Sequence, residues 1–294
     1  MPNAKTWLEV SLNGPWSRDR QPLIPITVGE IVEQGIACAR AGAAIIHVHA
    51  YDERTGRQND DPDLYAAIIE GIRAKADVIV YPTLPFAGHP NAPGALTAIE
   101  RFAHVEVLAK RGLLEWSVVD PGSTHIAALA DIESGKEGFL YANPESHVRR
   151  GLALAAQYGY HPGYAIYEPA FLRLGAALER AYQGVPQPIY RFMFSSGLSF
   201  GFPPEPFALD AYLHLLAREA PNAPWMIAGL DVDITPLIAH AVHRGGHVRV
   251  GLEDAPFGTM KTNIQQVDEA IARIDAAGGE LANAKEIRLV LGKA

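Results

Sequence analysis

Short apolar runs alternate with longer segments of helical period along almost the whole chain, and this alternation constrains the fold more than any other feature. The short runs are typical of buried parallel strands, and the longer segments have the spacing of amphipathic helices. Eight strand–helix pairs are expected for a (β/α)8 barrel, whereas doubly wound sheets usually have about five to seven strands. We therefore predict the α/β class, with a single (β/α)8 TIM barrel over residues 1–294 and an added C-terminal helix.

The element boundaries follow from the same pattern. Thr27 with Glu30 three residues later predicts a capping box, and Gly42 and Gly112 stand where helices should end. The expected strands are Thr6–Leu12, Ala44–His49, Val78–Tyr81, Leu114–Val119, Tyr164–Tyr167, Ile189–Phe194, Trp225–Ala228 and His247–Leu252. The expected helices are Val28–Arg40, Pro62–Lys75, Leu96–Lys110, Pro144–Tyr158, Phe171–Tyr182, Pro206–Arg218, Thr235–His243 and Asn263–Ala277, and the added helix is Ala284–Leu291.

Composition and charge exclude several classes of partner. The net charge of −8 and the lack of a lysine–arginine stripe argue against nucleic acid. No apolar run approaches the roughly 18 residues that span a membrane, and the N-terminal segment has no signal-peptide pattern. The single cysteine, Cys38, rules out an internal disulfide. We expect a cytoplasmic protein with no membrane partner.

The second expected strand ends in two histidines one residue apart, in the run Ala43-Ala44-Ile45-Ile46-His47-Val48-His49. Side chains two residues apart in a strand point to the same face, so His47 and His49 lie side by side. Two imidazoles at the end of a buried strand are suited to holding a divalent metal. The alternative is a pair of unrelated histidines, each hydrogen-bonded to its neighbours.

The last expected strand carries the second polar pattern. Arg249, Gly251 and Glu253 share one face by alternation, and a face with two charges cannot pack on helices. In a barrel, alternate strands contribute to the same layer, so strands two and eight can bring His47, His49 and Glu253 together. The result would be a two-histidine, one-carboxylate catalytic metal site with open positions. Alternatively, Arg249 and Glu253 could form a structural ion pair.

Other polar residues at strand ends are weaker candidates. Thr83 and Ser117 have hydroxyls that could hold a substrate carboxylate at the barrel mouth, whereas acids such as Asp120 and Glu168 are more typical of caps and turns. His247 shares the face of Arg249 but lies low in its strand, so we interpret it as a structural core histidine.

Two motifs resemble those of a known family. Ala41-Gly42-Ala43-Ala44-Ile45-Ile46-His47-Val48-His49, followed by Asp52 and Gly56, resembles the second strand of the β-keto acid cleavage enzymes. Gly245-Gly246-His247-Val248-Arg249-Val250-Gly251-Leu252-Glu253-Asp254 is similar to the closing strand of that family, and Trp225-Met226-Ile227-Ala228-Gly229 also fits. The order and spacing of these motifs extend the resemblance across essentially the whole chain.

The resemblance implies a zinc-dependent barrel, usually a homotetramer. Such an enzyme condenses a β-keto acid with acetyl-CoA as co-substrate, then releases acetoacetate and a new acyl-CoA. By resemblance, His47, His49 and Glu253 match the ligands of Zn2+, and Arg249 with Asp254 matches the pair that deprotonates the keto acid. Thr83 stands where the family has a substrate-binding serine, and Ser117 stands near a family threonine.

Departures from the family pattern concern the substrate. Tyr51 replaces a frequent arginine, the fifth strand reads Gly163-Tyr164-Ala165 where the aminohexanoate enzyme has an acid, and Asn13-Gly14-Pro15-Trp16 replaces a glutamate loop. A pocket without these acids is less suited to an ammonium group, so we expect a neutral or apolar β-keto acid. The aromatic residues that could line this pocket are Trp16, Tyr51, Phe86 and Tyr167.

Two other functions remain open at this point. The first is a zinc-dependent aldolase or hydrolase on the same barrel, which would use a metal-bound water and no CoA. The second is a barrel that only binds a keto acid. Arg249 and Asp254 argue against the second function, because a binding protein needs no base beside a metal.

Overall fold

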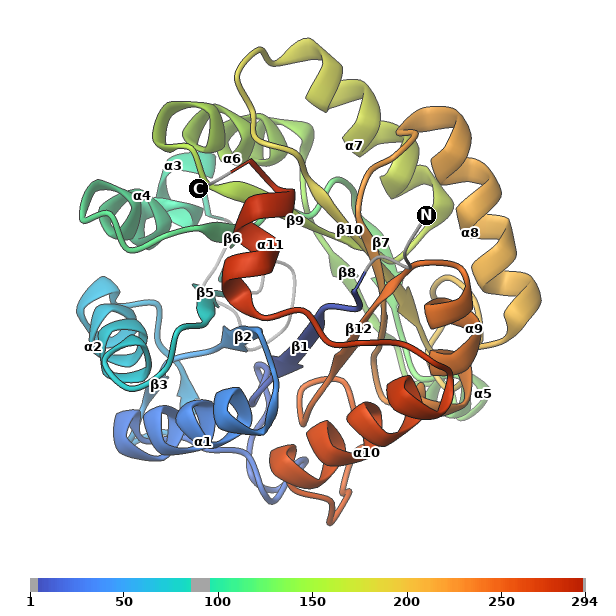
Figure 1. Ribbon diagram of the computed structural model, residues 1–294, viewed down its shortest axis with the longest axis horizontal. Helices are drawn as coiled ribbons and strands as arrows, with labels where there is room; N and C mark the ends of the chain where they lie inside the picture. Colours follow the sequence, from blue (N-terminus) through green and yellow to red (C-terminus); the bar gives the residue numbers. More distant parts are fainter. Residues whose placement is uncertain (1–4, 86–95, 293–294) are drawn as a thin grey trace.

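Eight parallel strands form a nearly closed barrel with helices around it, which confirms the predicted fold class (Figure 1). The computed structural model describes residues 5–85 and 96–292. The strand order is β5-β2-β1-β12-β11-β10-β9-β6, and the two outermost strands of that order, β5 and β6, lie next to each other. These strands are β1 Leu8–Ser11, β2 Ile45–Val48, β5 Ile79–Pro82, β6 Trp116–Val118, β9 His161–Ile166, β10 Ile189–Phe194, β11 Trp225–Gly229 and β12 His247–Val250.

The helices begin and end largely where the capping residues predict. The α1 helix starts with a capping box between Thr27 and Glu30, and it stops at Gly42, whose φ of 130° favours glycine. The helices around the barrel are α1 Val28–Ala41, α2 Pro62–Arg73, α3 Ala98–Arg101, α4 Ala103–Lys110, α6 Glu145–Tyr158, α7 Pro169–Ala181, α8 Pro206–Glu219, α9 Ile238–His243 and α10 Asn263–Ala276, with a 3-10 turn, η1 Thr235–Leu237, before α9.

The helix expected at Leu96–Lys110 is two helices, α3 and α4, so that prediction was wrong in its continuity. The break lies at Phe102, whose backbone leaves the helical region at φ −102° and ψ 9°. The turn allows both Phe102 and Arg101 to be buried, and Arg101 donates a hydrogen bond of 2.9 Å to the carbonyl of Ala142. Tertiary packing therefore interrupts a segment of helical period.

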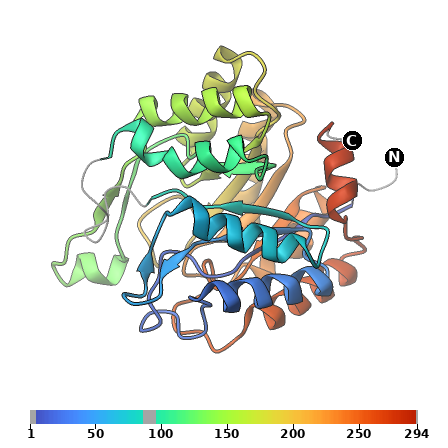
Figure 2. The ribbon, with the colours of Figure 1, turned by 90° about the vertical axis from the view of Figure 1, so that its left-hand side faces the viewer.

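Two hairpins that the sequence did not predict extend the carboxyl ends of the barrel strands. The first pairs β3 Tyr51–Asp52 with β4 Arg57–Gln58. The second pairs β7 Thr124–Ile126 with β8 Phe139–Tyr141 and encloses α5 Leu129–Glu133. Figure 2 shows the second hairpin at one end of the barrel and the last helix, α11 Ala284–Val290, at the other. These strands are too short to produce a recognisable alternation.

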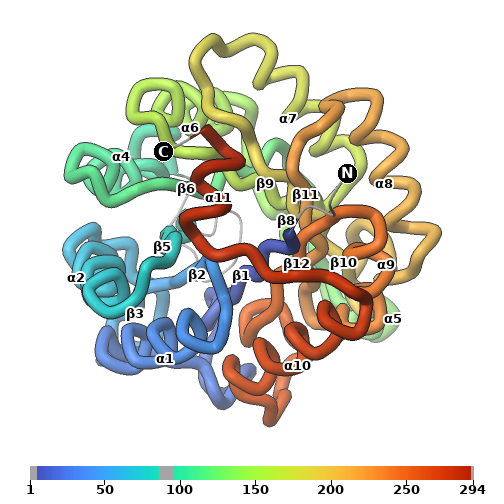
Figure 3. Tube along the Cα trace, in the orientation of Figure 1, coloured from blue at the N-terminus to red at the C-terminus, as the bar shows by residue number. Residues whose placement is uncertain are grey.

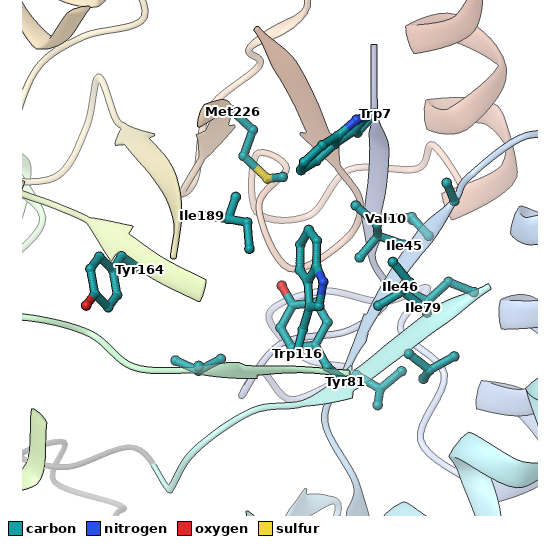
Figure 4. Packing of buried hydrophobic residues seen from close by; sticks show 14 of the residues in the cluster. Trp7, Val10, Ile45, Ile46, Ile79, Tyr81, Trp116, Tyr164, Ile189 and Met226 are labelled. Atoms are coloured by element: carbon teal, nitrogen blue, oxygen red, sulfur yellow. The ribbon is translucent and has the colours of Figure 1, made fainter. Parts of the chain in front are cut away.

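The opposite end of the barrel is closed by α11, which lies across it (Figure 3). Ala282 N–H donates to the carbonyl of Thr6 at 2.9 Å, which ties the segment before α11 to the residues before β1. Above α11, Trp7, Trp116 and Tyr81 pack together inside the barrel (Figure 4). We call this end the floor. Within the described residues, no helix is long and apolar enough to cross a membrane.

Candidate active site

His47 and His49 lie at the carboxyl end of β2, and their rings are 5.2 Å apart. The main chain of His49 is held by Asn13, whose Oδ1 accepts from the His49 N–H at 2.9 Å and whose Nδ2 donates to the His49 carbonyl at 3.0 Å. The ring of His47 packs on Tyr81 at a centroid distance of 4.6 Å. Strand geometry and these contacts direct both imidazoles into one cavity, which we call the inner cavity.

Glu253 completes the cluster, although the strand that was expected to carry it is shorter than predicted. The prediction of a strand through Leu252 was wrong, because β12 ends at Val250. Gly251 then turns the chain with a φ of 134°, and a Cβ at this position would lie 2.1 Å from the carbonyl oxygen of Ser11. After this turn, the Glu253 carboxylate lies 3.4 Å from His47 Nε2 and 3.3 Å from His49 Nε2.

The buried polar atoms of this cluster fit a divalent metal. One atom from each of His47, His49 and Glu253 lies within 4.8 Å of the others. His47 Nδ1 and His49 Nε2 are buried without a hydrogen-bond partner among the described residues, and Glu253 Oε2 has only ionic neighbours there, Arg249 Nη2 at 3.0 Å and His47 Nε2 at 3.4 Å. Buried polar atoms are normally satisfied, so such a group needs an explanation. Two imidazoles and a carboxylate are a common donor set for catalytic zinc and related metals.

The protonation states agree with a metal-binding role. Burial lowers the pKa of His47 well below its usual value, which keeps the imidazole neutral, as ligation requires. Burial alone would raise the pKa of Glu253, but Arg249 and the two histidines outweigh it and hold this pKa well below its usual range. The ring of His49 is oriented by Gln58, whose Oε1 lies 2.9 Å from Nδ1. Such contacts behind a ligand fix its ring orientation.

Arg249 connects the cluster to two more carboxylates. Its Nε and Nη2 donate to both oxygens of Asp254 at 2.8 and 2.7 Å, and its Nη1 donates to Glu9 at 3.1 Å. Arg249 Nη2 also lies 3.0 Å from Glu253, so the ion pair that we considered as an alternative to the metal site coexists with the cluster. Burial raises the pKa of Asp254 to about 6. Asp254 does not line the inner cavity, whereas Arg249 does.

The two hydroxyl candidates have different positions. Thr83 lines the inner cavity with His47 and His49, and among the described residues its hydroxyl makes one long contact, 3.4 Å to the carbonyl of Leu84. Ser117 is buried but does not line this cavity, and its hydroxyl has no partner among the described residues. Its neighbour Val118 lines the cavity instead, because alternate residues of β6 face opposite sides.

Of the aromatic residues predicted to line the substrate pocket, some line the inner cavity and others do not. Tyr51 is buried and donates from its hydroxyl to the carbonyls of Gly14 and Trp16, so it holds the loop after β1 and does not line the inner cavity. Tyr167 lines this cavity, and together with Trp16 it also lines an adjoining cavity, the outer cavity. Phe86 lies outside the described residues.

Sequence reasoning missed three residues of the inner cavity. Asp120 was interpreted as a turn residue, but it lines the cavity, accepts from the Ala165 N–H at 3.0 Å and accepts from the hydroxyl of Tyr141. Tyr141 comes from the unexpected second hairpin, so no signal could have found it. Arg191 could have been found, because a charged residue within the apolar run Ile189–Phe194 is unusual in a buried strand.

Comparison with known protein families shows to which family this chain belongs. The model of the beta-keto acid cleavage enzyme family matches residues 5–292. The chain belongs to this family. The match confirms the resemblance seen in the two strand motifs.

Curated relatives of this beta-keto acid cleavage enzyme family member are distant but cover nearly its full length. A 3-oxoadipate:acetyl-CoA acetyltransferase from Cupriavidus necator is 27% identical, over 97% of this chain and 94% of the relative. A 3-dehydrocarnitine:acetyl-CoA trimethylamine transferase from Rhizobium meliloti is 26% identical, over 90% and 88%. Among solved structures, a binary complex of ObcA with oxaloacetate superposes with a TM-score of 0.73 at 16% identity, covering 92% of this chain and 67% of that one. The structural likeness supports the barrel fold.

Proposed function

We propose that this protein condenses a β-keto acid with acetyl-CoA and releases acetoacetate and a new acyl-CoA. The single observation that carries the proposal is the buried cluster of His47, His49 and Glu253, whose ligand atoms converge and which Arg249 joins to Asp254 in a barrel of this family. The names of the relatives agree, because several act with acetyl-CoA on acids that carry a 3-oxo group.

His47, His49 and Glu253 would hold the metal, which we propose to be zinc. When bound, such an ion supplies Lewis acidity that stabilises negative charge on a keto oxygen. Gln58 and Asn13 keep His49 in its orientation, and Arg249 keeps the Glu253 carboxylate charged. Thr83 is placed to donate from its hydroxyl to the substrate carboxylate, since it lines the same cavity.

We propose Asp254 as the base that removes a proton from the carbon between the keto group and the carboxylate. Asp254 lies behind the wall of the inner cavity: it follows Glu253 directly in the chain, and Arg249, which lines the cavity, donates to both of its oxygens. A pKa of about 6 is close to the range in which a general base works best. The resulting carbanion attacks the thioester carbonyl of acetyl-CoA. CoA then moves to the former keto carbon, the adjoining C–C bond breaks, and acetoacetate leaves.

Three finer properties belong to the same proposal. We propose that the side chain of the substrate is not an ammonium, because Gly163 and Ala165 supply no acid in the fifth barrel strand, β9, and the cavity acid Asp120 already accepts from Tyr141 and from the Ala165 N–H. By family resemblance, we propose a homotetramer. We also propose a cytoplasmic location.

The test is a panel of β-keto acids, each incubated with acetyl-CoA and zinc-loaded protein, with acetoacetate and the new acyl-CoA followed by mass spectrometry. We expect both products, in equal amounts, and only when the thioester is present. Cleavage of a keto acid without any thioester would instead support a zinc-dependent aldolase or hydrolase. A matched sample treated with a chelator separates metal dependence from thioester dependence.

A further inference from the structure

Arg191 lies within β10, on the wall of the inner cavity opposite the histidines. In the strand order of the barrel, β10 is four strands away from β2, so the two strands face each other across the axis. Both Arg191 and His47 line the inner cavity. The backbone of Arg191 thus lies across the cavity from the histidines, while its guanidinium reaches over to Tyr81, whose ring packs on His47.

The guanidinium of Arg191 is only partly satisfied. Its Nη2 donates to the hydroxyl of Tyr81 at 2.5 Å and to Glu9 at 3.5 Å. Its Nη1 makes no hydrogen bond with the described residues, and its Nε is buried without a partner there. Arg249 differs, because Asp254, Glu253 and Glu9 occupy its three nitrogens.

A purely structural role for Arg191 does not account for this arrangement. Among the described residues, its only carboxylate partner is Glu9, which also binds Arg249 and accepts a hydrogen bond of 2.5 Å from Tyr81. Removing a guanidinium from water costs several kcal/mol unless its donors are matched, and here one carboxylate is shared between two guanidiniums. The side chain nevertheless stays charged, since Glu9 and Tyr81 outweigh the effect of burial and raise the pKa of Arg191.

We propose that Arg191 binds a carboxylate at the end of the variable side chain of the substrate, so that the protein acts on 3-oxo dicarboxylic acids. This inference rests on the proposed function, in which the keto oxygen and its neighbouring carboxylate lie on the wall of His47, His49 and Thr83. Arg191 lines the same cavity and offers its unbonded Nη1 to the rest of the substrate. Arginine is the residue best suited to a carboxylate, because its planar fork matches the two oxygens. The neutral side chain expected from the sequence is replaced by an anionic one.

The experiment compares two matched 3-oxo acids of equal chain length, one with a terminal carboxylate and one with its methyl ester. Binding of each acid to zinc-loaded protein without acetyl-CoA is measured by isothermal titration, and kcat/KM is measured with acetyl-CoA. We expect the wild type to prefer the dicarboxylate. Arg191→Met should weaken binding of the dicarboxylate by about 10²-fold, seen mainly as a higher Kd and KM. The same substitution should change binding of the ester by less than about threefold.

Two further variants keep the test sharp. Tyr81→Phe removes the hydroxyl that accepts from Arg191 in the same buried network. Tyr81 does not line the inner cavity, so this variant should still prefer the dicarboxylate. Arg191→Lys keeps the positive charge and should retain part of this preference if Arg191→Met does not fold. Circular dichroism and zinc content verify that each variant is comparable with the wild type.

The outcomes separate this inference from the proposed function. If Arg191→Met weakened binding of the dicarboxylate and of the ester equally, the inference would be overturned, because Arg191 would then bind the carboxylate that all β-keto acids share. An ester that binds the wild type as tightly as the dicarboxylate would also overturn it. Dicarboxylate binding that depends on Arg191, without acetoacetate from any acid, would refute the proposed function and leave the inference standing.

Discussion

The two ends of the barrel both contain buried histidines, but His47 and His49 at the mouth each keep one ring nitrogen without a hydrogen-bond partner among the described residues, unlike His247 at the floor. At the floor, His247 Nδ1 accepts from the N–H of Trp7 at 3.1 Å, and the two rings stack at 3.9 Å. At the mouth, His47 Nδ1 and His49 Nε2 have no partner among the described residues, and both rings lie beside Glu253. Burial is thus common to both ends, and the ring nitrogens left without a partner distinguish the histidines of the candidate metal site from the packing histidine at the floor.

The electrostatic environments of His247 at the floor and His47 at the mouth also differ. Burial lowers the pKa of His247 to about 3, and no charged group opposes this effect. Burial also lowers the pKa of His47, but Glu253 opposes it while Arg249 adds to it. The floor therefore keeps an imidazole neutral by apolar packing, whereas the mouth places its imidazoles among charges. Substitutions at the two ends should have separable effects on function and on stability.

The largest expected effect is at the mouth. His47→Ala should remove the bound zinc and reduce acetoacetate formation to background, because two ligands hold the metal too weakly. The melting temperature of the metal-free protein should change little, since the floor and the helices are packed independently of the ion. Zinc is measured by mass spectrometry of the metal, and His125→Ala, at an exposed histidine, is the matched control. One zinc per chain in His47→Ala would contradict the assigned ligand set.

A smaller effect is expected for the proposed base. Asp254→Asn should keep the metal but lower kcat by roughly 10²- to 10⁴-fold, the usual contribution of a positioned base. Steady-state rates with matched zinc content measure this effect. Near-normal kcat would show that Asp254 only positions Arg249, to which it is bound through both oxygens.

The contact behind His49 should have an intermediate effect on the metal. Gln58→Leu removes the acceptor at His49 Nδ1 and should weaken zinc binding by about 10- to 100-fold. Competition with a chelator of known affinity measures the change, and Gln58→Glu, which keeps an acceptor oxygen, is the control. Unchanged zinc affinity in Gln58→Leu would mean that Asn13 alone orients this ligand.

The smallest expected effect is at the floor and appears as pH-dependent stability. The pKa of His247 is lowered from 6.5 to about 3, so its contribution is present above pH 6.5 and is lost as the pH falls toward 3. Between pH 7 and pH 5, this loss amounts to about 2 kcal/mol of unfolding free energy. Denaturant titrations of the metal-free protein should show it, and His247→Asn should remove it while activity at neutral pH persists. An identical pH dependence in both proteins would contradict the assignment.

The sequence by itself determined the barrel and the core of its candidate site. Strand and helix periods are local properties, so the eight strands were expected close to where they lie, and β10 matches its expected bounds Ile189–Phe194. The spacing of His47 and His49 is also local, because alternation along one strand needs no knowledge of the rest of the chain. Their meeting with Glu253 was predicted from the parity of strands two and eight, but β12 ends at Val250 and the turn at Gly251 brings Glu253 to them.

Only the tertiary structure decided which polar residues reach the cavity. The alternation of side chains along a strand predicts that Ser117 and Val118 face opposite sides of the sheet, but it does not say which of them faces the inside. In the closed barrel, Val118 lines the inner cavity. Tyr51 is drawn away from the cavity by carbonyls of the loop after β1, and the short second hairpin brings in Tyr141. Arg191 is held by Tyr81 and Glu9, which accept from its Nη2 and lie more than 100 residues away in the chain. Contacts between such distant residues arise from packing of the whole barrel, and no local pattern in the chain encodes them.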